Sequence, residues 1–154
     1  MDRNLIERYA AGAGQLRSSI AGLSRDELTA YPVPGTWSIQ QIVLHLMDSD
    51  LIGADRMKRV AAEDKPPMLI GYDESAFARG LFYHELDVQL ACDVFEKNRQ
   101  LTAEILRRLP PAAFARKGHH DEHGDMTLAE LLATYVDHLE HHLKFIHQKR
   151  QLLK

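Results

Sequence analysis

Residues 127–153 read TLAELLATYVDHLEHHLKFIHQKRQLL and predict a long amphipathic helix. Thr127 and Glu130 have the spacing of a capping box, which places the start of the helix at Thr127. Apolar side chains follow at intervals of three and four residues: Leu128, Leu131, Tyr135, Leu139, Leu143 and Ile146. One face of this helix is therefore expected to be buried.

Histidines stand out on the same helix. His142 falls within the apolar arc, His138 lies at its edge, and His141 is rotated toward the polar side. Two histidines four residues apart on one helix can bind the same metal ion without distorting the backbone. The pair His138 and His142 is therefore a candidate part of a metal site.

Other long helical patterns precede this one and share its apolar periodicity. They cover residues 2–20, 38–63 and 85–109, the last starting as early as Ser75. Ser38 is a good N-cap, and Pro66-Pro67 and Pro110-Pro111 forbid continuation of the helices before them. No strand pattern, repeat or domain boundary is recognisable. The sequence predicts an all-α fold, a single four-helix bundle domain over residues 1–154 with long connectors.

The connectors carry fewer signals. Ser24 and Glu27 form another capping box, which predicts a short helical turn in the first connector. The segment 117–125, which contains His119, His120 and His123, is predicted to be a polar loop with solvated histidines. Whether these histidines take part in a binding site is left open.

The helix over 38–63 supplies one histidine, His45, at the edge of its apolar arc. A lone histidine there is commonly a hydrogen-bonded core residue, but it can also complete a site with His138 and His142. Three neutral imidazoles leave a coordination position open, which is typical of catalytic rather than structural sites. Zinc is the first expectation, and nickel and iron also accept imidazole. The His-Glu-x-x-His and Glu-x-x-His motifs of zincins and di-iron bundles do not occur in the chain.

Composition narrows the function classes. With 19 Lys and Arg against 22 Asp and Glu, the net charge of −3 gives no basic field for nucleic acid. The single cysteine, Cys92, suits a reducing compartment and is expected to be a small buried residue. No signal peptide or membrane segment is recognised, so a cytoplasmic protein without nucleic-acid or membrane partners is predicted.

The segment WSIQQIVLHLMDSD at 37–50 resembles the second helix of the DinB superfamily, also called DinB/YfiT-like proteins. GDMTLAE at 124–130, followed by His138-x-x-His-His142, fits the same family, as do Asn98-Arg99, Pro66-Pro67 and Tyr72-Asp73-Glu74. The resemblance implies an up-down-down-up bundle, often a homodimer, with a metal triad at His45, His138 and His142. It also implies chemistry like that of the bacillithiol- or mycothiol-dependent S-transferases and the mycothiol-dependent maleylpyruvate isomerase.

We therefore expect a metal-dependent enzyme that acts on a small molecule, with S-transferase-like or hydrolase-like chemistry and, for the former, a low-molecular-weight thiol. Asp48 is the candidate acid or base, and Asp50 is a weaker one; the alternative is that both are solvated carboxylates. Arg99 could steer an anionic substrate or form a surface ion pair. The alternative function is a non-catalytic metal- or ligand-binding stress protein.

Overall fold

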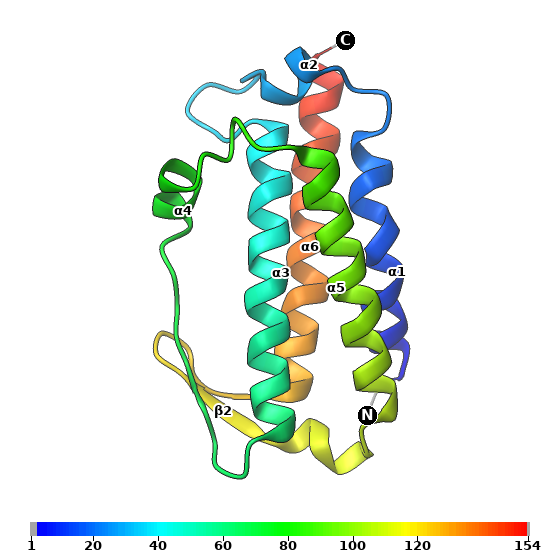
Figure 1. Cartoon of the computed structure of the whole chain (residues 1–154), viewed down its shortest axis with the longest axis vertical. Helices are drawn as coiled ribbons and strands as arrows, with labels where there is room; N and C mark the ends of the chain where they lie inside the picture. The colour runs from blue at the N-terminus through cyan, green and yellow to red at the C-terminus, as the bar shows by residue number, and fades with distance from the viewer. Residues whose placement is uncertain (1–2, 154) are drawn as a thin grey trace.

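Four long helices pack side by side in the computed structural model, which describes residues 3–153 (Figure 1). Helices α1 (Arg3–Ile20) and α6 (Leu128–Leu152) run in one direction, and α3 (Ile39–Ala62) and α5 (Val88–Arg108) run in the other. Both α1 and α3 pack against α5 and α6, so α1 and α3 lie on a diagonal of the bundle. The predicted four-helix bundle is confirmed. None of the described helices is both long and apolar enough to cross a membrane.

The helix ends follow from local hydrogen bonds. Capping boxes start the short helix α2 (Arg25–Thr29), α3 and α6, with Ser24, Ser38 and Thr127 as the respective N-caps. The predicted start of the first helix at Asp2 lies outside the described residues. The predicted third helix over 85–109 is α5 (Val88–Arg108), which begins behind the N-cap Asp87. The earlier start at Ser75 is wrong, because α4 (Glu74–Gly80) is a separate helix that ends before Phe82, whose φ is 57°.

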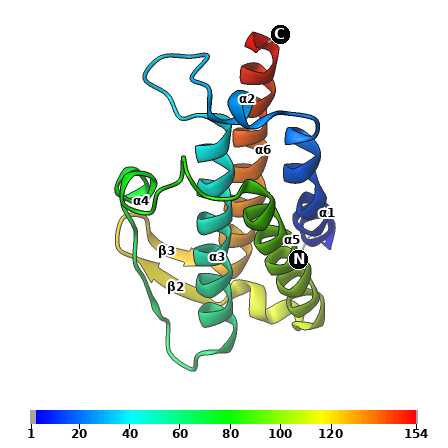
Figure 2. The ribbon, with the colours of Figure 1, turned by 45° about the horizontal axis from the view of Figure 1, so that its top comes forward.

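The long connectors carry a small sheet, and the expectation of no strands is wrong. Strand β1 (Met68–Leu69) pairs in parallel with β2 (Lys117–His120), and β2 pairs antiparallel with β3 (Gly124–Thr127). A 3₁₀ helix, η1 (Pro111–Ala115), precedes β2. The buried positions of β2 are Gly118 and His120, so the strand alternates without the apolar side chains that sequence patterns detect. Figure 2 shows this hairpin and α4 on the same side of α3.

A buried ion pair joins the four helices where two apolar core clusters meet. Arg99 of α5 donates from Nε to Asp50 Oδ1 of α3 at 2.8 Å, and both side chains are 97–98 % buried, with exposed fractions of 2 % and 3 %. Its Nη2 donates to the Tyr135 carbonyl of α6 at 2.7 Å, and its Nη1 donates to the Tyr9 carbonyl of α1 at 3.2 Å. The alternatives of a solvated Asp50 and a surface ion pair of Arg99 are therefore wrong.

Gly12, in the middle of α1, is explained by the same ion pair. A Cβ atom added at Gly12 would lie 2.4 Å from Nη1 of Arg99. The missing side chain lets the helix approach the guanidinium, which offsets the lower helix propensity of glycine.

Candidate metal centre

His45 lies on α3, two turns after the Ser38 cap, and its side chain faces the interior of the bundle. It is fully buried, with 0 % of its surface exposed. The ring of Trp37, the residue before the cap, lies 4.9 Å from the His45 ring between centroids. The capped start of α3 thus places both rings at one point of the core.

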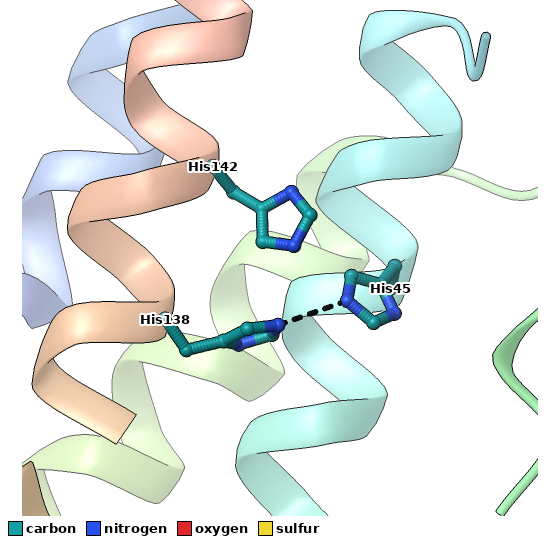
Figure 3. A group of neighbouring side chains, drawn as sticks. All are labelled: His45, His138 and His142. Carbon is teal, nitrogen blue, oxygen red and sulfur yellow. Dashed lines mark hydrogen bonds between the residues drawn. The ribbon is translucent and has the colours of Figure 1, made fainter. Parts of the chain in front are cut away.

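His138 and His142 approach His45 from α6 (Figure 3). The ring centroids of His45 lie 5.0 Å from His138 and 4.8 Å from His142, and those of the α6 pair are 4.6 Å apart. His45 Nε2 and His138 Nε2 are 3.0 Å apart. One ring nitrogen from each residue can be chosen so that all three lie within 4.8 Å of one another. The structure brings the three predicted ligands together from two helices.

All three histidines are neutral near pH 7. Burial, followed by the other two imidazoles, lowers the pKa of His45 from 6.5 to about 3. Burial also lowers the pKa of His138 to about 3 and, with His141 nearby, the pKa of His142 to about 4. A metal ion binds the neutral form of imidazole, so these groups need no proton removed before coordination.

The polar atoms of the triad fit a cation better than they fit one another. Among the described residues, Nδ1 of His45 and Nδ1 of His142 are buried without a hydrogen-bond partner. Leaving such groups unpaired costs about 1–3 kcal/mol each. A divalent ion bound through one nitrogen of each ring would accept the lone pairs that neutral imidazoles offer, including those of His45 Nε2 and His138 Nε2, which face each other at 3.0 Å. Nitrogen donors without a carboxylate suit zinc, nickel and iron.

Cavities lie on both sides of the triad. A largely apolar cavity of about 340 Å³ is lined by His142, Trp37, Ile42 and Phe145, among others. A more polar cavity of about 170 Å³ is lined by His138 and by residues of the hairpin and the 70–74 segment. One histidine of the triad therefore lies in the wall of each cavity.

The polar cavity contains groups that the sequence reasoning missed. Its lining includes Tyr72, Glu74 and Glu122, and Tyr72 shares a hydrogen bond with Ser49 of α3. Burial, with Asp73 and Glu122 nearby, raises the pKa of Glu74 above its ordinary value. In the sequence, Tyr72-Asp73-Glu74 carries only a resemblance to the family. Its contact with the triad region depends on a connector whose path the sequence does not specify.

Asp48, the predicted acid or base, lies on α3 one turn after His45. Its Oδ2 accepts a hydrogen bond of 2.5 Å from the hydroxyl of Tyr83, and Asp48 lines neither of the two cavities beside the triad. Its catalytic role stays a prediction. Cys92 is buried as expected, and burial raises the pKa of its thiol to about 11.

The segment 117–125 forms a strand pair rather than a loop, and one of its three histidines is buried rather than solvated. His119 is exposed and pairs with Asp125, whereas His120 is 3 % exposed. His120, Glu122 and His123 place one ligand atom each within 4.8 Å of the others. The strand alternation of β2 turns His120 inward, which the loop prediction could not anticipate.

Comparison with known proteins connects this arrangement to a family. The sequence profile of the DinB superfamily matches residues 8–146. A Bacillus licheniformis protein is 31% identical over 156 residues, covering 97% of this chain and 88% of its own. An Oceanobacillus iheyensis protein is 27% identical over 131 residues, covering 85% of this chain and 75% of its own. Both carry the name "putative metal-dependent hydrolase".

Solved structures share the fold. YfiT from Bacillus subtilis, described as a "probable metal-dependent hydrolase with an unusual four-helix bundle topology", has a TM-score of 0.89 at 23% identity, covering 96% of this chain and 85% of its own. A mycothiol-dependent maleylpyruvate isomerase has a TM-score of 0.72 at 10% identity, covering 92% of this chain and 58% of its own. At these identities the likeness shows the fold alone.

Proposed function

Because the chain belongs to the DinB superfamily, we propose that it is a metal-dependent hydrolase of a small molecule, with His45, His138 and His142 as the metal ligands. The observation that carries the proposal is the convergence of three neutral imidazoles from two helices, with ring nitrogens within 4.8 Å. The names of the relatives support hydrolysis as the reaction class.

The chain's own residues have defined tasks in this proposal. A divalent ion on three imidazoles would lower the pKa of a coordinated water to about 7. His45 and His138 are held in place by α3 and α6, which the Asp50–Arg99 pair and its bonds lock together. Glu74, whose pKa is raised above its ordinary value by burial, is our candidate proton acceptor because it lines the same cavity as His138.

We propose zinc as the resident ion, with nickel and iron as the alternatives that metal analysis separates. The S-transferase alternative requires a low-molecular-weight thiol, and a coordinated thiol would be deprotonated and nucleophilic. The proposed small-molecule substrate, the homodimer and the cytoplasmic location stay predictions, as does a purely metal- or ligand-binding role.

The test is metal content, measured by elemental mass spectrometry on untagged wild type, His142→Ala and His141→Ala. His141 is the matched control, because it is an exposed histidine next to His142 on the same helix. We expect near-stoichiometric metal in wild type and His141→Ala. In His142→Ala, we expect the protein to bind metal at least about 100-fold more weakly, so that little metal remains after purification. Equal metal in the two variants, or no metal in reconstituted wild type, would contradict the ligand assignment.

The reaction class needs a separate assay. Metal-loaded protein is given ester and amide substrates with and without a small thiol. Turnover without thiol supports the hydrolase, and turnover that requires the thiol supports the S-transferase. Metal binding without turnover in either condition supports the non-catalytic alternative.

A further inference from the structure

The apolar cavity beside His142 has a feature that apolar packing does not need. Its lining includes Lys149, from the last turns of α6, together with Thr36 and Trp37 from the connector before α3. Lys149 is 5 % exposed although it is a lysine, and lysine is almost never buried this far without a partner. A buried ammonium at a cavity wall calls for an anion.

No anion of the described chain fills this need. Within residues 3–153 there is no carboxylate within ion-pair distance of Lys149, and no Asp or Glu lines the cavity. The ammonium Nζ donates to Thr36 Oγ1 at 2.5 Å, and this hydroxyl in turn donates to the Val33 carbonyl at 2.8 Å. Since an ammonium has three donors, two are left for a ligand.

The remaining lining of the cavity indicates that the rest of such a ligand would be small and apolar. Ile42 and the rings of Trp37 and Phe145 make the wall apolar. Val33 and Phe145 keep 37% and 39% of their surface exposed at the same cavity, as expected for apolar side chains at an entrance. A volume of about 340 Å³ lies at the lower end of the range for small-molecule sites.

The spacing of Lys149 and His142 along α6 indicates how long the ligand would be. Lys149 follows His142 by seven residues, or two turns, so both face the same side of the helix about 10 Å apart along its axis. A molecule whose anionic end meets Lys149 therefore places its other end beside the triad.

We propose that this cavity binds a small apolar molecule with one carboxylate head, which pairs with Lys149 while the opposite end reaches His142. The identification of this molecule as the substrate rests on the proposed function, whereas its binding does not. Three neutral imidazoles leave the charge of a divalent ion uncompensated, so the whole path from Lys149 to the triad favours an anionic ligand.

Trp37 makes the proposal directly measurable, because it lines the cavity and is the single tryptophan of the chain. The full-length protein, as purified and after chelation of metal, is titrated with hexanoate, hexan-1-ol and hexylammonium while tryptophan fluorescence is recorded. We expect saturable binding of hexanoate in both preparations, weaker binding of the alcohol and weakest binding of the ammonium. Equal affinities for all three, or no saturable response to hexanoate, would overturn the proposal without any variant.

Two variants then test whether the positive charge of Lys149 binds the carboxylate. Lys149→Met should weaken hexanoate binding by about 10- to 100-fold and leave hexan-1-ol binding within about twofold. Lys144→Met removes the same charge from an exposed position of α6 and should change neither affinity. Circular dichroism checks that both variants fold.

The outcomes separate this proposal from the hydrolase. Hexanoate binding that needs metal and is lost in His142→Ala but kept in Lys149→Met places the anion on the metal and overturns the Lys149 site alone. Binding that depends on Lys149, in a protein that takes up no metal on reconstitution and turns over no ester or amide, supports the cavity and overturns the hydrolase alone.

Discussion

The centre of the bundle and the β2–β3 hairpin each gather three side chains that could hold a metal ion, yet they differ in every other respect. At the bundle centre, the ligands stand on two long helices, and burial keeps them neutral. On the hairpin, Glu122 and His123 are exposed, and Nδ1 of His120 already accepts a hydrogen bond from the Glu122 amide at 3.1 Å. The comparison teaches that proximity is not enough: the ligands must also be held by a rigid frame.

The largest expected difference between the two regions is in how much stability each loses when one carboxylate is removed. Asp50→Asn leaves the buried Arg99 guanidinium without its counter-ion, which should lower the free energy of unfolding by about 3–5 kcal/mol. Asp125→Asn removes the same charge from the hairpin, where the side chain of Asp125 is 63% exposed and pairs with His119. We expect little or no loss there, because solvent screens an ion pair between exposed side chains. Urea denaturation measures both, and equal losses would show that the Asp50–Arg99 pair does not stiffen the bundle.

Protonation gives the next largest effect. The pKa of His45 is about 3 in the folded chain against 6.5 when unperturbed. Between pH 7 and 5 the unfolded chain therefore takes up a proton at this position, while the folded chain does not. Stability must fall as the pH drops through 6.5, and this loss continues until the pH reaches about 3.

Replacing His45 by leucine tests this sign. In the presence of a chelator, wild type should lose about 2 kcal/mol more stability than His45→Leu between pH 7 and pH 5. Urea denaturation at the two pH values gives the difference. Parallel losses in the two proteins would mean that His45 is protonated in the folded state, so that the bundle centre would not present a neutral ligand.

The difference between the bundle centre and the hairpin also explains which parts of the fold and the candidate site could be predicted from the sequence. The helix over 127–153 and its histidines are local features, because capping and a 3.6-residue period fix which side chains share a face. His45 could be added because it lies near the apolar arc of another capped helix. These signals are strong where one long element decides the geometry.

The rest depends on contacts between distant segments. Asp50 and Arg99 read as surface charges, because nothing local shows that they neutralise each other in the core. The hairpin strands pair through backbone hydrogen bonds, and the buried positions of β2 are Gly118 and His120. The sequence therefore lacks the apolar alternation that would predict a strand there. Lys149 likewise looks like an ordinary cation of the last helical turn until the connector containing Thr36 covers it.

The smallest effect is expected at the histidines of the β2–β3 hairpin. His123→Ala removes one of the three hairpin ligand groups, yet it should leave the metal content of the protein at about one ion per chain. The reason is that the exposed Glu122 and His123 are ordered only by a short turn, while the lone pair of His120 Nδ1 is engaged by the backbone. Coordination there would have to offset both the side-chain entropy and the lost hydrogen bond. Elemental analysis of wild type, His123→Ala and the double variant His123→Ala/His142→Ala separates the two regions. Two ions in wild type and one in His123→Ala would make the hairpin a metal site in its own right. One ion in the first two proteins and none in the third leaves the metal to the buried triad.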